Sequence, residues 1–192
     1  MSRWDPDAQG RLRAAAMELF SERGYDDVTV AEIAERAGLK KRSFFRHYTD
    51  KREVLFTGSV DFQRAVVDEV RRAPESARPV EAVTTALAIG GAALVKWGEP
   101  VRQRQQLIAS SLELRERELI KMDALTTAVA DALRTRGVDD VSATLTARAG
   151  IAAFTTAFDR WAGQSEQEDF PTLMDDAIEQ LRVALCGCDT DS

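Results

Sequence analysis

Apolar residues recur at helical spacing along nearly the whole chain, and this periodicity restricts the fold more than any other feature. Glycine or proline interrupts the pattern wherever a helix would stop, as at Gly24, Gly38, Pro74, Gly98 and Gly137. No segment alternates polar and apolar residues as a half-buried strand does, and β-branched runs are absent. The sequence therefore predicts an all-α protein.

The periodicity predicts helices over about 7–23, 29–37, 41–48, 50–72, 80–97, 101–110, 112–136, 141–161 and 170–185. The fourth of these is expected to run unbroken from Asp50 to Arg72, because Asp50 and Glu53 have capping-box spacing. Such a helix would join the first part of the chain rigidly to the rest.

The composition is that of a soluble globular protein, with 44% hydrophobic and 30% charged residues in a chain of 192. The longest weakly polar stretch, Ala82 to Trp97, is shorter than the roughly 20 apolar residues that a membrane span needs. The first ten residues contain no apolar run, so no secretory signal is expected and the cytoplasm is the expected location.

The net charge of −6 is unevenly distributed. Residues 1–52 contain 11 Lys and Arg against 9 Asp and Glu, whereas residues 53–192 contain 15 against 23. Between Lys40 and Arg52 six basic residues face a single acid, Asp50. This asymmetry indicates an anion-binding head on an acidic body.

The residues available for chemistry argue against an enzyme. His47 is the only histidine, and it lies in the most basic stretch of the chain. No P-loop or GxGxxG is present, and a four-ligand zinc site cannot be assembled, so we expect no cofactor and no metal. Cys186 and Cys188 have the spacing of a redox pair, although two unremarkable thiols in a polar tail are the favoured interpretation.

The motif between residues 29 and 48 predicts a helix-turn-helix. Thr29-Val-Ala-Glu32 is a capping box that opens one helix, and Ala37-Gly38 ends it in a tight turn before a second short helix. A helix-turn-helix places its second helix in the DNA major groove, where base edges can be distinguished.

Several side chains of this second helix are suited to nucleic acid. Lys41, Arg42 and Arg46 can bond the O6 and N7 atoms of guanine. Ser43 and His47 can donate to phosphates, although His47 could instead bond a backbone group nearby.

Residues at two helix starts extend this expected site. Lys51 and Thr29 lie where free backbone N–H groups favour a phosphate. Phe44 and Tyr48 are expected in the core of the head, and Phe45 is expected to be partly exposed.

The stretch from Leu12 to Leu55 resembles the N-terminal domain of the TetR family of bacterial transcriptional regulators. The resemblance is carried by Ala16, Leu19-Phe20, Gly24-Tyr25, Thr29-Val-Ala-Glu-Ile33-Ala34, Ala37-Gly38-Leu39, Ser43-Phe44-Phe45-Arg46-His47-Tyr48 and Asp50-Lys51. It implies a homodimeric repressor with a three-helix DNA-binding domain (1–50) and a six-helix ligand-binding and dimerisation domain (51–187), followed by a polar tail (188–192).

By this resemblance, the family's backbone and flanking-base contacts fall on Ser43, Phe45, His47 and Lys51. Three positions depart from the family. Phe45 replaces the usual Tyr, so a phenolic phosphate contact is lost. Lys40 replaces a frequent Ser or Thr cap and Arg42 replaces a small residue, which makes the head more basic and adds Lys40 to the predicted DNA contacts.

A ligand pocket is expected in the acidic body. Its predicted lining residues, each also an ordinary core candidate, are Phe56, Val60, Leu94, Trp97, Leu107, Met122 and Phe154. Residues 102–161 resemble the C-terminal domain of TetR regulators that bind acyl-CoA-like ligands, including regulators of mycofactocin clusters, through Leu112-Glu-Leu-Arg-Glu-Arg117 and Trp161. The resemblance implies that Arg102 and Arg104 meet phosphates or a thioester oxygen, with plain surface arginines as the alternative.

The last two predicted helices have broad apolar faces that suit a four-helix interface between two chains. The predicted interface residues are Phe158, Trp161, Met174, Ile178 and Leu181. The alternative is that both helices pack inside one chain.

Together these features predict a repressor that leaves a pseudo-palindromic double-stranded DNA operator when it binds a small apolar or amphipathic inducer, such as an acyl-CoA. Whether the ligand releases or promotes DNA binding stays open at this stage. One alternative is a small all-α enzyme or carrier of acyl ligands without a DNA function. Another is an architectural DNA-binding protein, which would not need the large acidic body.

Overall fold

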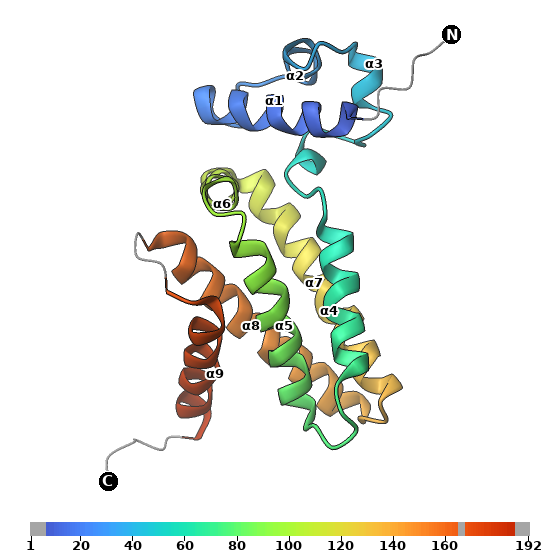
Figure 1. The fold of residues 1–192 in the computed structure, drawn as a ribbon, viewed down its shortest axis with the longest axis vertical. Coiled ribbons are helices and arrows are strands. Elements are labelled where there is room, and N and C mark those ends of the chain that lie inside the picture. The colour runs from blue at the N-terminus through green and yellow to red at the C-terminus, as the bar shows by residue number, and fades with distance from the viewer. Residues whose placement is uncertain (1–6, 165–167, 187–192) are drawn as a thin grey trace. The chain divides into compact units, whose positions relative to one another are not determined.

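The structure is a computed structural model that describes residues 7–164 and 168–186. Within these ranges all regular elements are helical and no strand occurs, so the all-α prediction is confirmed (Figure 1). The elements are α1 (Ala8–Arg23), α2 (Val30–Arg36), α3 (Lys41–Phe44), the short 3-10 helix η1 (Arg52–Val54), α4 (Ser59–Arg72), α5 (Pro79–Val95), α6 (Glu99–Ser110), α7 (Leu112–Thr135), α8 (Asp140–Gly163) and α9 (Phe170–Cys186).

Most predicted boundaries agree with the observed helices to within two residues, because the stop signals act as expected. Gly24 and Gly38, with φ angles of 82° and 68°, adopt left-handed conformations after α1 and α2. α3 is shorter than predicted and ends at Phe44, after which residues 45–47 form a turn.

The predicted unbroken helix from Asp50 to Arg72 is wrong. The Asp50 carboxylate accepts hydrogen bonds from the backbone N–H groups of Arg52 (2.9 Å) and Glu53 (3.2 Å), but the turn that it caps is only the three-residue η1. Gly58 then takes a φ of 88°, which a right-handed helix does not allow, and α4 starts at the next residue. Asp50 thus caps a short turn, and Gly58 prevents that turn from continuing into α4.

The chain forms two compact units. Unit 1 consists of residues up to Gly58 together with Gln103–Leu119, and unit 2 consists of Ser59–Arg102 together with the residues from Ile120 onward. Two helices therefore belong to both units: α6 begins in unit 2 and ends in unit 1, and α7 begins in unit 1 and continues in unit 2. The functional division at residue 50 stays a prediction.

Unit 1 has a core that combines distant segments of the sequence. Side chains from α1 and α2, including Leu12, Phe20 and Ile33, are fully buried with Phe44 of α3. Leu114 of α7 belongs to the same cluster. The head is therefore stabilised by residues that follow it by more than fifty positions.

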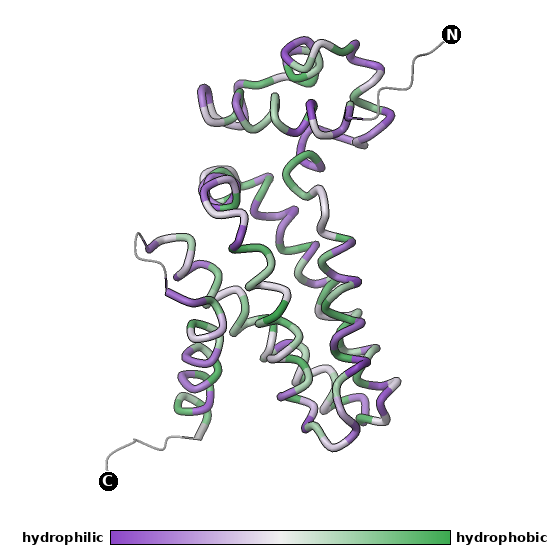
Figure 2. Tube along the Cα trace, viewed as in Figure 1, coloured by the Kyte–Doolittle hydropathy of each residue, from purple (hydrophilic) through white to green (hydrophobic). Residues whose placement is uncertain are grey.

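Unit 2 is organised around α5, which packs against α4, α8 and α9. The α5 trace is coloured mostly toward the hydrophobic end of the scale in Figure 2, as expected for a helix with neighbours on several sides. Gly91 allows the closest approach, because a Cβ atom there would lie 2.0 Å from the Phe170 ring of α9. Gly150 of α8 likewise allows a close approach to α5, because a Cβ atom there would clash with the Val83 side chain.

Candidate nucleic-acid interface

The start of α2 has the predicted capping box. The Thr29 hydroxyl accepts from the Glu32 backbone N–H (3.3 Å) and donates to the Glu32 carboxylate (2.7 Å), and the Thr29 N–H donates to the same carboxylate (2.8 Å). These bonds to Thr29, together with the Arg23 guanidinium 2.9 Å away, lower the pKa of Glu32 to about 2. The Thr29 hydroxyl proton is therefore already donated to Glu32. The predicted phosphate contact at Thr29 then depends on the backbone N–H groups at the start of α2.

The short helix α3 is joined to the core of the head by aromatic side chains. Phe44 and Tyr48 are buried, with ring centroids 5.3 Å apart. The Tyr48 hydroxyl donates to the Gln9 backbone carbonyl (3.3 Å) and accepts from the Thr57 hydroxyl (3.3 Å). The core positions predicted for both aromatic residues are confirmed.

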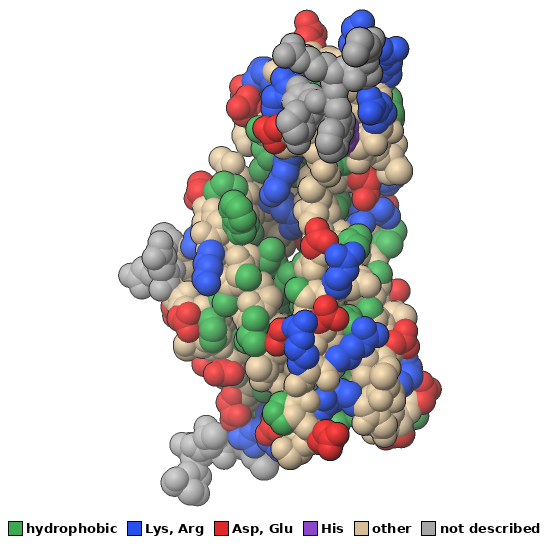
Figure 3. Space-filling view, turned by 45° about the vertical axis from the view of Figure 1, so that its right-hand side comes forward, with side chains coloured by type: hydrophobic (Ala, Val, Ile, Leu, Met, Phe, Trp, Pro, Cys, Tyr) green, Lys and Arg blue, Asp and Glu red, His purple; other side chains and the backbone are tan. Residues whose placement is uncertain are grey.

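The opposite side of this segment forms what we call the recognition surface, which consists of Lys40, Lys41, Arg42, Ser43, Phe45, Arg46 and His47. All are exposed except Ser43, which is half-buried. Lys and Arg side chains gather at the exposed surface of this part of the protein in Figure 3. Among the residues that the structure describes, these side chains make no hydrogen bond or ion pair. The structure therefore brings this predicted group together and leaves its donors available.

Lys51 occupies a different environment from the recognition surface. Its ammonium group donates to the backbone carbonyls of Tyr25 (2.7 Å) and Val28 (2.8 Å) and lies 4.0 Å from the centroid of the Tyr25 ring. Burial lowers the pKa of Lys51. Its first role is to hold the α1–α2 connector against η1, which leaves one ammonium hydrogen for the predicted phosphate.

Residues 103–119 belong to the same unit as the head, which the sequence analysis does not predict. The Arg104 Nε donates to the Leu55 carbonyl (2.7 Å), and the guanidinium lies 5.1 Å from the centroid of the Phe56 ring. Arg117 pairs with Glu53 at 2.5 Å. The available signal was the apolar spacing of Leu107, Ile108 and Leu114, which resembles that of any packed helix.

This arrangement divides the predicted ligand-lining residues between the units. Phe56 and Leu107 are buried in the core of unit 1. In unit 2, Leu94 and Met122 are partly buried against the core to which Phe154 belongs. Val60 (63%) and Trp97 (73%) are instead exposed. The ligand-binding role of this set stays a prediction.

Phe154 is the centre of a group of aromatic rings in unit 2. Its ring centroid lies 5.6 Å from that of Phe62, 5.7 Å from that of Phe158 and 5.8 Å from that of Phe170. Trp161 is next to Phe158, at 5.6 Å. We call these five residues the aromatic core.

The arginines that the resemblance assigned to a ligand both have partners. Arg102 lies over the Trp161 ring at 4.4 Å and donates to the Gln164 carbonyl. Arg104, besides its bond to Leu55, lies 3.4 Å from the Glu118 carboxylate. An anionic ligand would have to compete with these contacts.

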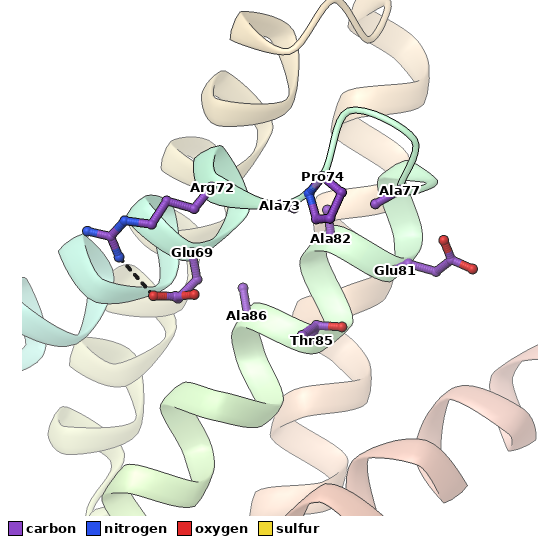
Figure 4. A pocket seen from close by; sticks show the side chains of 9 residues that line it. All are labelled: Glu69, Arg72, Ala73, Pro74, Ala77, Glu81, Ala82, Thr85 and Ala86. Carbon is purple, nitrogen blue, oxygen red and sulfur yellow. Dashed lines mark hydrogen bonds and ion pairs between the residues drawn. The ribbon is translucent and has the colours of Figure 1, made fainter.

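Two hollows on unit 2 are described, and neither is lined by a predicted pocket residue. The first, of about 220 Å³, lies where α4 meets α5 beside the ion pair of Glu69 and Arg72 at 2.8 Å, and Pro74 and Ala77 form its rim (Figure 4). The second, of about 460 Å³, is lined by the residues Thr84, Thr85, Ala88, Ile89, Ala92, Ala93, Lys96, Pro171 and Asp175.

The predicted dimer residues differ in how deeply their side chains are buried. Phe158, Trp161 and Met174 are inside the core of unit 2, so for these three side chains the structure favours the alternative that α8 and α9 pack within one chain. Ile178 and Leu181 are half-exposed. Of the two cysteines, Cys188 and the side chain of Cys186 lie outside the described residues, as does the tail 188–192.

Neither a metal-binding cluster nor a single membrane-spanning helix occurs in the described part of the chain. No group of three or more His, Cys, Asp or Glu side chains there is placed to hold a metal ion. No single helix there is long and apolar enough to cross a membrane; α5 and α6 reach that composition only as a pair bent by 105°.

The chain is similar to known proteins in both halves. Residues 12–56 match the family model for bacterial regulatory proteins of the tetR family, and residues 77–185 match the model for the MftR C-terminal domain. The transcriptional regulator TcmR of Streptomyces glaucescens is 35% identical over 76 residues, which cover 40% of this chain and 34% of TcmR. The transcriptional activator FasR of Mycolicibacterium smegmatis is 40% identical over 48 residues, which cover 25% of this chain and 22% of FasR. The match thus spans about a third of these curated relatives or less.

Among solved structures, the FadR repressor of Thermus thermophilus in complex with lauroyl-CoA has a TM-score of 0.59 and 25% identity, covering 96% of each chain. The likeness extends over both units. It agrees with the two family models in relating the whole chain to one kind of protein.

Proposed function

Because the chain belongs to the TetR family of bacterial transcriptional regulators, we propose that it is a repressor that binds a pseudo-palindromic operator through the recognition surface. The observation that carries this proposal is the set of exposed basic side chains that have no partner in the part of the chain that the structure describes and that lie beside the buried Phe44 and Tyr48. Guanidinium and ammonium groups exposed on α3 and the turn that follows it are suited to phosphates and guanine edges. The proposal implies a cytoplasmic protein, since the operator is chromosomal DNA.

The test is selection of duplexes from a random pool by the full-length protein. We expect enrichment of a two-fold symmetric sequence, and we expect Arg46→Ala to weaken its binding and relax the base preference. Arg115→Ala is the matched control, because it removes the same charge from an exposed position of unit 1 outside the recognition surface. A pool that stays random after selection would contradict the proposal.

We further propose that an acyl-CoA-like ligand controls this binding. The matching MftR model and the lauroyl-CoA complex of the similar FadR support this class of ligand. In unit 2 the aromatic core, with Leu94 and Met122 packed against the same cluster, offers the apolar environment that an acyl chain needs. On this proposal the acyl chain of the ligand enters unit 2 by displacing rings of the aromatic core.

The ligand signal is proposed to reach the head through α6 and α7, the two helices that belong to both units. α6 carries Arg104, which holds the Leu55 carbonyl, and α7 carries Arg117, which pairs with Glu53. A shift of either helix therefore pulls on the segment that follows the recognition surface. The break at Gly58 makes α4 a poorer rigid lever than the sequence suggested.

Calorimetry with lauroyl-CoA, on the free protein and on its complex with the selected duplex, tests this control. Coupling of about 1–3 kcal/mol changes the ligand affinity roughly 5–150-fold, and the operator must act on the ligand by the same factor. Weaker binding to the complex would show that the ligand releases the operator, and tighter binding would show that it promotes operator binding. Equal affinities would remove the ligand switch from the proposal, and turnover of the thioester would favour the enzyme alternative.

We also propose that the chain forms a homodimer, as TetR regulators do. Ile178, Leu181 and Leu185 of α9 are spaced to share one helical face and are half-exposed or exposed. A second copy could cover this face. Sedimentation of Leu181→Glu should show a weakened dimer, whereas Glu179→Gln, on the same helix, should leave the dimer intact.

A further inference from the structure

Phe45 is the one large apolar side chain within the recognition surface. It is 52% exposed, whereas the adjacent Phe44 is fully buried. Arg42 and Arg46, on either side of it in sequence, are exposed and basic. About half of the ring is thus open to solvent among basic side chains that have no partner in the described part of the chain, where a binding partner can reach it.

The Phe45 ring packs against the buried ring of Phe44. Its backbone has helical angles (φ −69°, ψ −7°), so the residue continues the turn of α3. The two phenylalanine rings meet nearly edge to face, with centroids 5.6 Å apart and planes at 79°. One edge of the Phe45 ring thus packs against a buried neighbour, and the rest of the ring is exposed.

The chemistry of the ring limits what it can contact on DNA. Phenylalanine has no donor or acceptor, so it cannot bond a phosphate oxygen or a polar base edge. The apolar group that base edges present in the major groove is the C5-methyl of thymine, which phenylalanine can contact. This inference rests on the proposed DNA binding: we propose that Phe45 reads a thymine methyl in each half of the operator, while its basic neighbours contact phosphates and guanine.

The experiment removes that methyl without changing base pairing. In the duplex selected by the full-length protein, each symmetric pair of thymines is replaced in turn by deoxyuridine. At one position we expect the wild-type affinity to fall about 4-fold per half-site, the effect of one methyl-sized apolar group. Phe45→Ala should bind more weakly overall and should not distinguish the two duplexes at that position.

Two control variants separate the methyl contact from general binding. Arg46→Ala should weaken binding to both duplexes and keep their ratio. Phe45→Leu, which retains apolar bulk, should keep part of the ratio, and it serves if Phe45→Ala binds too weakly to measure.

The inference is overturned if no thymine position is sensitive in the wild type, or if Phe45→Ala keeps the full loss. Failure of the pool to enrich any sequence would overturn the proposed DNA binding and this inference together. An enriched sequence that is indifferent to deoxyuridine would overturn this inference alone.

Discussion

The recognition surface of unit 1 and the aromatic core of unit 2 differ in what their residues do within the protein. In the first, basic side chains are exposed and unpartnered among the described residues, so the fold makes no use of them. In the second, Phe154, Phe158 and Trp161 are buried against one another. A residue that the fold does not need is more readily assigned to a partner than a residue that the fold requires.

Phe44 and Phe45 are adjacent in sequence but differ in burial. Phe44→Ala removes a fully buried ring and should lower the free energy of unfolding by about 3–5 kcal/mol. Phe45→Ala, at a half-exposed position, should change it by about 0.5 kcal/mol or less. Chemical denaturation followed by circular dichroism measures both. Similar losses for the two variants would show that Phe45 belongs to the core.

Substitution within the basic surface should affect binding without affecting folding. Arg42→Ala and Arg46→Ala should leave the unfolding midpoint unchanged, because neither side chain has a partner among the described residues. Each loss of a base contact should cost about 1–3 kcal/mol of operator binding. Fluorescence anisotropy with the selected duplex measures this. Unchanged affinity for both variants would show that neither arginine contacts the operator.

Lys51→Ala should behave in the opposite way to these arginine variants. It removes two hydrogen bonds to the α1–α2 connector, each worth about 0.5–1.5 kcal/mol. We therefore expect a lower unfolding midpoint, with weaker binding to every duplex and no change in base preference. Stability equal to that of the wild type, together with weakened binding, would instead make Lys51 a direct phosphate contact.

Arg104→Leu tests the proposed route between ligand and head. It removes the donor to the Leu55 carbonyl and should destabilise unit 1 by about 1–3 kcal/mol. Binding of the operator and of lauroyl-CoA should each persist, whereas the effect of one on the other should shrink toward none. Coupling that remains at its wild-type value would exclude this contact from the route.

The smallest expected effect is a pH dependence that arises at the start of α2. The pKa of Glu32 falls from its ordinary value of 4.5 to about 2, so the unfolded chain takes up this proton first as the pH drops. Stability from this carboxylate is fully present above pH 4.5 and is lost between about pH 4.5 and 2. Thermal melts of Glu32→Gln should show a shallower decline over this window, and identical pH profiles would contradict the assignment.

Much of the fold could be predicted from local signals, and the exceptions have physical causes. Glycine stops and the Thr29 capping box act within a few residues, so the helix bounds around them were accessible. The break at Gly58 is not predicted, because the helical spacing of apolar residues continues on both sides of it. The packing of Leu107 and Leu114 into the head depends on contacts between distant segments, which no local pattern encodes.

The two regions also differ in how far the sequence alone can single out site residues. In the recognition surface, charge and exposure identify candidates, because basic residues are rarely placed in a core. In the body, an apolar residue at helical spacing fits a pocket, an interface or a core equally well. Burial of Phe158 and Trp161, and exposure of Val60 and Trp97, became clear only with the three-dimensional packing.

The most direct measurement of the central claim is the salt dependence of operator binding by the full-length protein. If the recognition surface contacts phosphates, binding releases counterions, and several contacts per protomer should give a log–log slope of about −5 or steeper. Removing Lys40, to which no base contact is assigned, should make that slope shallower by about one unit per protomer. Specific binding whose affinity is the same across the salt range would contradict the account.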